Sequence, residues 1–146
     1  MQHETYPDDL IRDILTKTKV IAVVGLSNNE TRASFRVTQF LHSRGYRTLG
    51  VNPGLAGKDV AHSPVYASLG DIPEPVDMVD LFRNSDDADA AVDEALKMRS
   101  LPKYIWMQLG VRNDAAAARA EAKGVTVIMN RCPAIEYPRL MGSAKR

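Results

Sequence analysis

Short apolar runs alternate with amphipathic segments along this chain of 146 residues. Each apolar run is bounded by turn residues, and the runs fall near residues 20–26, 46–51, 76–82, 103–110 and 125–130. Runs of this length are typical of strands that are buried on both faces of a parallel sheet. Apolar residues at helical spacing in the remaining segments predict helices near residues 7–17, 33–44, 86–98 and 113–124.

This alternation predicts an α/β fold in which parallel strands are joined by right-handed crossovers. We expect one doubly wound domain over residues 1–146, with a mainly parallel five-stranded sheet, because no linker or internal repeat interrupts the pattern. Residues 55–75, rich in Gly, Pro, Asp and Ser, form the least regular stretch. Residues 132–140 are expected to form an extended tail with at most one turn.

The first strand, turn and helix carry the strongest chemical signal. Gly25 follows the strand directly, and a glycine there permits a ligand to approach the backbone closely. The helix N-terminus behind it offers N–H groups and partial positive charge to a phosphate. Ser27 and Ser34 can add hydroxyl donors, and Arg32 can add a bidentate contact. The alternative is that Ser34 only caps the helix and Arg32 is a solvated charge.

The same turn argues against the standard mode of NAD binding. It lacks the G-x-G-x-x-G pattern, and Asn52 stands where a dinucleotide fold places an acidic residue for the ribose hydroxyls. The phosphate-binding pattern G-x-x-x-x-G-K-[ST] is also absent from the sequence. We therefore expect a phosphate-bearing ligand that is bound in another way.

The residues that follow the other predicted strands support an anionic ligand. In open α/β sheets, ligands bind beyond the carboxyl ends of the strands. At the predicted strand ends of this chain, hydrogen-bond donors are common and carboxylates are rare. The residues at these ends are Gly25, Ser27, Asn52, Pro53, Arg83, Gln108, Gly110, Asn130 and Cys132. Lys58, in the loop after the second strand, could reach a further phosphate or could be a solvated lysine.

The bulk properties exclude several classes of partner. A formal net charge of +1 gives no basic face for nucleic acid or for a membrane surface. The apolar runs are far shorter than the roughly 20 residues of a membrane span. The single cysteine cannot form an internal disulfide, and the N-terminus lacks the pattern of a secretory signal. These observations favour a protein of the reducing cytoplasm.

Five segments together resemble the small bacterial CoA-binding proteins of the CoA-binding-domain family. The family shares its fold with the N-terminal CoA domain of the succinyl-CoA synthetase alpha subunit. The resemblance covers nearly the whole chain, and its markers are VVGLS with Arg32 and Ser34 behind it, GYRTLGVNP (residues 45–53), PEPVDMVDLFR (residues 73–83), WMQLGV (residues 106–111) and RCPAIEYPRL (residues 131–140). Each marker is weak alone, whereas their order and spacing are specific.

The resemblance implies a Rossmann-like domain that binds coenzyme A where the strand order reverses. Around the pyrophosphate it places Gly25, Ser27, Arg32 and Ser34. Near the 3′-phosphate end of the adenosine it places Asn52, Pro53 and Lys58, with Arg83 beside the nucleotide. On the pantetheine side it places Gln108, Gly110, Asn130 and Cys132.

The chain also departs from the synthetase, because it has no second domain with a phosphorylatable histidine and no ATP-grasp portion. The resemblance therefore implies a protein that binds CoA or acyl-CoA without evident catalytic apparatus of its own. Three alternatives stay open. One is an enzyme that uses Cys132 on a thioester or a disulfide, another is an NAD(P)-binding protein, and the third is a subunit that supplies a CoA site to a homo-oligomer or to a partner enzyme.

Overall fold

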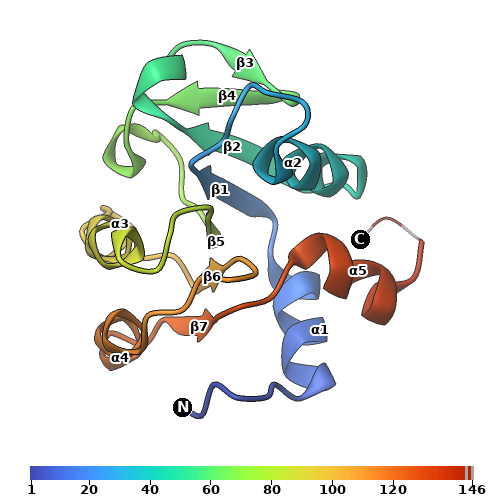
Figure 1. Ribbon diagram of the computed structural model, residues 1–146, viewed down its shortest axis with the longest axis vertical. Helices are drawn as coiled ribbons and strands as arrows, with labels where there is room; N and C mark the ends of the chain where they lie inside the picture. Colours follow the sequence, from blue (N-terminus) through green and yellow to red (C-terminus); the bar gives the residue numbers. More distant parts are fainter. Residues whose placement is uncertain (144, 146) are drawn as a thin grey trace.

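The apolar runs form the strands of one seven-stranded sheet in the computed structural model, which describes residues 1–143 and 145 (Figure 1). The strands are β1 (Val20–Val24), β2 (Arg47–Val51), β3 (Asp59–Val60), β4 (Ser63–Tyr66), β5 (Met78–Leu81), β6 (Tyr104–Met107) and β7 (Thr126–Ile128). The α-helices are α1 (Asp8–Lys17), α2 (Ala33–Ser43), α3 (Asp87–Leu96), α4 (Asp114–Ala122) and α5 (Pro133–Met141). Two single turns of 3-10 helix, η1 (Pro53–Leu55) and η2 (Leu69–Asp71), lie between strands.

The strand order is β3-β4-β2-β1-β5-β6-β7, and all neighbours except β3 and β4 are parallel. From β1 the chain first adds strands on one side and then returns to add β5, β6 and β7 on the other. The order therefore reverses between β1 and β5. This confirms the predicted class, a doubly wound Rossmann-like sheet, and places the ligand crevice of such folds at the ends of these two strands.

The prediction of five strands is wrong, because the irregular stretch contains the hairpin of β3 and β4. The hairpin is short, and its two-residue turn is formed by Ala61 and His62, whose φ angles are 50° and 65°. Turns of this kind usually carry Asn-Gly, so the sequence offers no ordinary signal for this one. Ser63 stabilises the turn, because its hydroxyl group donates to the carbonyl oxygen of Ala61 at 3.1 Å.

The sheet buries an apolar core on each face. One core lies between the sheet and the helices α3 and α4, and the other lies between the sheet and α1, α2 and α5 (Figure 1). Successive strand residues alternate between the two cores, as a strand buried on both faces requires: Val23 and Val24 belong to opposite cores. Among the described residues, no helix combines the length and the apolar character that a membrane span requires.

The expected extended tail is also wrong, because residues 133–141 form the helix α5. Pro133 occupies the first turn, where its missing N–H costs nothing. Pro138 lies inside the helix, where a proline removes a backbone hydrogen bond and disfavours helix formation. Packing against the second core overrides that preference. Tyr137 is fully buried and makes edge contacts with the rings of Phe40 and Tyr46, each at 6.0 Å between centroids.

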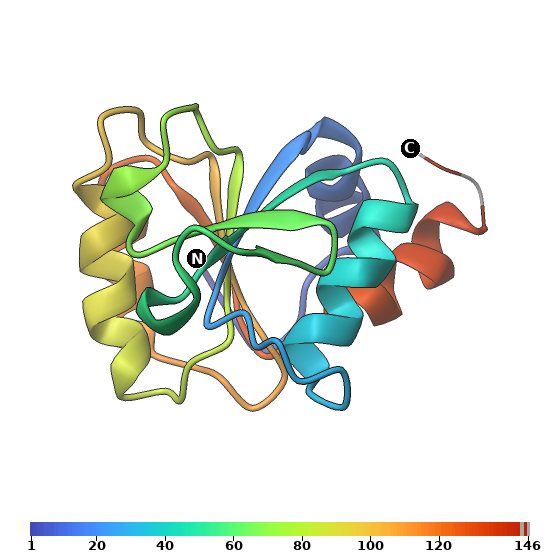
Figure 2. The ribbon, with the colours of Figure 1, turned by 90° about the horizontal axis from the view of Figure 1, so that it is seen from above.

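The connections that follow β1, β5 and β6 gather along one edge of the sheet, the lower edge in Figure 2. This is the carboxyl edge of the parallel strands. The segments that lead into β5 and β6 lie at the opposite edge (Figure 2). The candidate site is built at the carboxyl edge.

Candidate functional site

Gly25 forms the turn at the end of β1. Its φ angle of +91° lies in the left-handed region, and its N–H donates to the carbonyl oxygen of Val51 at 2.9 Å. A Cβ at this position would lie 2.5 Å from the carbonyl oxygen of Phe82. Only glycine fits both constraints, so the chain passes close to the ends of β2 and β5 at the point where the strand order reverses.

The segment between β1 and α2 folds against the helix. The N–H of Ser27 donates to the hydroxyl oxygen of Ser34 at 3.0 Å, and the hydroxyl oxygen of Ser27 accepts from the N–H of Asn29 at 3.0 Å. Ser34 is buried. These bonds bring two of the predicted residues together and hold the loop over the first turn of α2.

The N-terminus of α2 carries no compensating negative charge. Its first turn has no acidic residue, whereas the first turns of the other four α-helices in the described chain each contain Asp or Glu. Arg32 occupies the N-cap position, and no side chain caps the helix there. The unpaired N–H groups and the positive end of the helix dipole are therefore available to an external anion.

Three arginines near the ends of β1 and β5 lack a polar partner among the described residues: Arg32, Arg36 and Arg83. Five arginines elsewhere in the described chain are paired with carboxylates, namely Arg12, Arg47, Arg112, Arg119 and Arg139. Two more, Arg44 and Arg131, donate to backbone carbonyl oxygens. Because guanidinium groups bind phosphate well, the unpaired set marks a place suited to an anionic ligand.

Two hollows flank the reversal point. The first, of about 370 Å³, is lined by Gly25, Ser27, Arg32, Ala33, Ser34 and Phe82, and it opens at the N-terminus of α2. The second, of about 310 Å³, lies on the α3 side and contains Pro53 and Arg83 over the apolar ends of β1 and β2. The structure thus brings four of the predicted residues into one hollow and two into its neighbour.

The side chains of two predicted site residues, Asn52 and Asn130, are hydrogen-bonded to backbone groups. The amide of Asn52 donates to the carbonyl oxygen of Leu26 at 2.9 Å and accepts from the N–H of Gly54 at 3.0 Å. Asn130, at φ +57°, accepts from the N–H of Gly110 at 2.8 Å. Both side chains hold the carboxyl edge in shape. Lys58 is exposed just before β3 and lines neither hollow.

Gln108 is buried and contacts an acidic residue within the sheet. Its Nε2 lies 2.9 Å and 3.2 Å from the two carboxyl oxygens of Asp80 on β5, and Asp80 is fully buried. Burial raises the pKa of Asp80 to about 7, and the hydrogen bond from Gln108 partly opposes that rise.

Cys132 is buried at the N-cap position of α5. Burial raises the pKa of its thiol, although the N–H groups of Ala134 and Ile135 favour the thiolate. A raised pKa leaves less thiolate at neutral pH, and the thiolate is the reactive form. This weakens the hypothesis that Cys132 is a nucleophile.

Arg36 and Asp80 were not among the predicted site residues. Arg36 lies in the first turn of α2, four residues after the N-cap residue Arg32, and two arginines at that spacing around a helix start are a usable signal. Asp80 is an acidic residue inside an otherwise apolar buried strand, and acidic residues are rarely buried without a partner. Its position in the strand pattern could have identified it.

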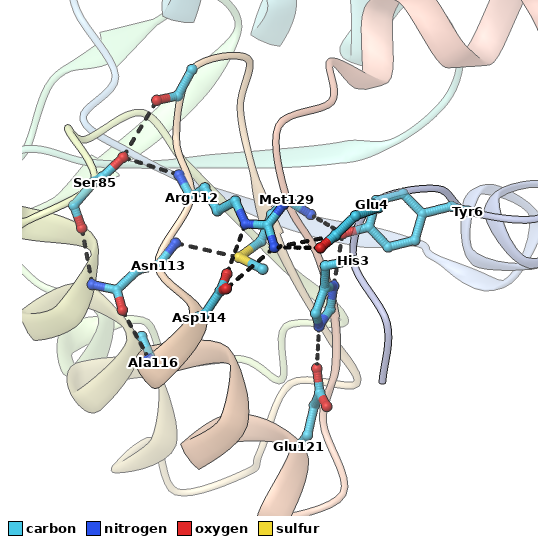
Figure 3. A network of polar contacts seen from close by, with 11 residues as sticks. His3, Glu4, Tyr6, Ser85, Arg112, Asn113, Asp114, Ala116, Glu121 and Met129 are labelled. Atoms are coloured by element: carbon cyan, nitrogen blue, oxygen red, sulfur yellow. Dashed lines mark hydrogen bonds and ion pairs between the residues drawn. The ribbon is translucent and has the colours of Figure 1, made fainter.

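A second polar cluster lies where the N-terminal segment meets α4 (Figure 3). The N–H of Met129 donates to the hydroxyl oxygen of Tyr6 at 2.9 Å, and the same hydroxyl group lies 2.8 Å from Nδ1 of His3. His3 Nε2 lies 2.6 Å from a carboxyl oxygen of Glu121. Beside this chain, Arg112 contacts both Asp114 and Glu4 (Figure 3). We call this group of residues the N-terminal network.

A further hollow, of about 400 Å³, lies at the opposite edge of the sheet between residues 69–75 and 98–100. It contains the unpaired Arg99 but also Asp71 and Glu74, and Glu74 is bound by Arg47 at 2.6 Å. The acidic lining makes this hollow less suitable for an anion than the carboxyl edge.

A Rossmann-like sheet with an uncapped helix N-terminus at its reversal point is typical of nucleotide-binding α/β folds. The CoA binding domain family matches residues 19–138, and this chain belongs to that family. It is similar to the uncharacterized protein YneT of Bacillus subtilis (strain 168), with 34% identity over 122 residues, which are 84% of this chain and 87% of YneT.

Two solved structures have the same fold. The protein "cell-free ID.343" from Thermus thermophilus has a TM-score of 0.86 and 33% identity, covering 92% of this chain and 99% of its own. A hypothetical protein from Pyrococcus horikoshii OT3 has a TM-score of 0.86 and 34% identity, and the match covers 97% of this chain and 100% of that protein's chain.

Proposed function

We propose that this protein binds coenzyme A or an acyl-CoA at the carboxyl edge, across the ends of β1 and β5. The observation that carries the proposal is the set of unpaired arginines around the uncapped N-terminus of α2. Membership of the CoA binding domain family supports CoA as the anionic ligand.

In this proposal the pyrophosphate lies in the first hollow. The N–H groups at the start of α2 and the guanidinium group of Arg32 bind its oxygens, and the Gly25 turn lets the ligand approach the backbone. The hydroxyl group of Ser34, which accepts from Ser27, can donate its hydrogen to the ligand. Arg36 adds positive charge one helical turn further along.

The nucleotide extends toward the second hollow. Pro53 lies there beside Arg83, above the apolar residues Val24 and Val51. We assign Arg83 to the nucleotide and the exposed Lys58 to the 3′-phosphate end. The pantetheine arm then crosses the ends of β5, β6 and β7, where Gln108, Gly110, Asn130 and Cys132 lie, with the two asparagines acting through the loops they shape. The described residues of this site supply binding groups, so we propose a protein that binds CoA. We also propose that it works in the reducing cytoplasm, because its single cysteine cannot form an internal disulfide.

Calorimetric titration with CoA, dephospho-CoA and NAD tests the proposal. We expect CoA to bind more tightly than dephospho-CoA, and NAD to give no saturable heat. Replacing Arg32 and Arg83 together by Gln is expected to weaken CoA binding about a hundredfold or more, because hydrogen bonds to charged groups contribute roughly 1.5–3 kcal/mol each.

Arg119→Gln is the matched control, because Arg119 is bound by Asp89 and Asp93 on the outer surface of α3 and α4. That variant should bind CoA as the wild type does. Absence of CoA binding in ligand-free wild-type protein, or an unchanged affinity in the Arg32 and Arg83 double variant, would refute the site assignment.

A further inference from the structure

Asp80 and Gln108 form a buried polar pair at the carboxyl edge that the proposed function does not yet use. Asp80 is fully buried on the face of the sheet covered by α1, α2 and α5, with Val23 and Trp106 beside it in register on the neighbouring strands. Its two carboxyl oxygens share one amide nitrogen, Nε2 of Gln108. An ionised carboxylate only accepts hydrogen bonds, so the amide must turn its nitrogen toward Asp80.

The carbonyl oxygen of Gln108 consequently points away from Asp80. It has no hydrogen-bond partner among the described residues. Among the described residues, two side-chain atoms are both buried and without a hydrogen-bond partner: Thr38 Oγ1 and Arg44 Nε. The Gln108 oxygen does not belong to this group, although it has no partner either. The oxygen therefore reaches solvent, although Gln108 as a whole is only 6% exposed. An acceptor held in this way at the end of β6 is a specific feature of the carboxyl edge.

The position of this oxygen suits the pantetheine arm. The end of β6 lies two strands from β1, which is about 10 Å at the usual spacing between strands. The arm contains about twelve chain atoms from the pantoyl carbon to sulfur, as many as roughly four amino-acid residues, and spans roughly 13 Å when extended. An arm that starts from a pyrophosphate at α2 is therefore long enough to reach the end of β6, and its two secondary amides carry N–H donors.

We propose that the carbonyl oxygen of Gln108 accepts a hydrogen bond from a pantetheine amide, and that Asp80 is the positioning residue that keeps this oxygen turned toward the ligand. This inference rests on the proposed function, because it takes CoA as the ligand. Its consequence is that the protein distinguishes CoA from nucleotides with the same phosphates but no pantetheine arm.

The orientation depends on the charge of Asp80. When protonated, Asp80 gains an O–H that donates to the carbonyl oxygen of Gln108, and the amide then presents its NH₂ group to the ligand instead. Burial raises the pKa of Asp80 to about 7, which places this change near neutral pH. The titratable group that interacts with Asp80 from the neighbouring elements is the Cys132 thiol of α5, whose own pKa is raised by burial, while β1 and β6 present Val23 and Trp106.

The test compares the affinity for CoA with the affinity for the methyl ester of adenosine 3′-phosphate 5′-diphosphate, in which a methyl group replaces the pantetheine arm. Both ligands carry the same pyrophosphate diester and the same titrating 3′-phosphate, so the ratio of the two affinities isolates the contribution of the arm. We expect Gln108→Met to reduce this ratio about fivefold to tenfold, the usual effect of one hydrogen bond. Gln39→Leu, at an exposed position of α2, is the control and should leave the ratio unchanged.

The pH profile tests the role of Asp80. In the wild type the ratio should be larger at pH 8 than at pH 6, and Asp80→Asn should give a lower ratio that does not vary with pH. This variant decides the question if Gln108→Met fails to fold. A ratio that is independent of pH in the wild type, or a folded Gln108→Met protein with the wild-type ratio, would overturn the inference. Failure of both ligands to bind would instead refute the proposed function.

Discussion

The N-terminal network and the start of α2 are both rich in charged and polar side chains, but they differ in how those groups are satisfied. In the network every guanidinium, imidazole and phenol group has a partner: His3 bridges Tyr6 and Glu121, and Arg112 contacts Asp114 and Glu4 (Figure 3). At α2, Arg32 and Arg36 have none among the described residues.

This difference separates a structural cluster from a candidate binding site. A polar group that is already bound has little to offer to a ligand, whereas an unpaired guanidinium group beside free helix N–H groups gains a partner when an anion binds. The number of charged residues in a region is therefore a weaker indicator than the number left unpaired.

The strongest way to break the α2 region is to add a side chain at Gly25. Gly25→Ala combines a left-handed φ of +91° with a Cβ placed 2.5 Å from the carbonyl oxygen of Phe82, so the backbone must shift. We expect a loss of about 3 kcal/mol or more in the free energy of unfolding, measured by urea denaturation.

Gly110→Ala is the matched control, because Gly110 has φ +81° but a Cβ added there would meet no atom of a non-neighbouring residue within 4 Å. It should lose only about 1 kcal/mol. Equal losses in the two variants would show that close packing at the Gly25 turn is unimportant.

A second test concerns Asp80, beneath the proposed site. Because burial raises the pKa of Asp80 from 3.8 to about 7, the folded protein binds more protons than the unfolded chain between these values. This contribution to stability is therefore largest at low pH and is lost as pH rises toward 7, by on the order of 3 kcal/mol between pH 5 and pH 8.

Asp80→Asn removes this titration, so its stability relative to the wild type should improve from pH 5 to pH 8. Thermal unfolding at several pH values measures the effect. A difference between the two proteins that stays constant across this range would show that Asp80 titrates normally.

The smallest effect is expected in the N-terminal network. His3→Ala removes the link between Tyr6 and Glu121, and we expect a loss of about 1 kcal/mol in unfolding free energy with unchanged CoA affinity. Arg32→Gln should do the opposite, leaving stability nearly constant and weakening CoA binding. A His3→Ala protein with impaired binding would contradict the distinction between the two regions.

Much of the fold around the site could be predicted from the sequence. The apolar run before Gly25 corresponds to β1, and the helix expected over residues 33–44 corresponds to α2 (Ala33–Ser43). Both were predictable because the local spacing of apolar residues matches the faces that the fold buries. The hairpin of β3 and β4 could not be predicted, since its turn at Ala61 and His62 depends on surrounding packing and not on turn-forming residues.

Pairing within the site was harder to foresee than its location. The sequence places Asn52, Gln108 and Asn130 at strand ends, which is where they lie, but it does not show that each amide contacts another part of the chain. Such contacts join residues 20 or more positions apart. Predicting them requires the strand order, which the local pattern does not contain.

Backbone hydrogen exchange of the wild-type protein, measured with and without saturating CoA, tests most directly whether the start of α2 is the binding site. We predict slower exchange at residues 25–36 and 82–84 when CoA is present, and no change at residues 1–7 and 112–121, because only the first set surrounds unpaired donors. Unchanged exchange at residues 25–36, or protection concentrated in the N-terminal network, would show that CoA does not bind at the start of α2.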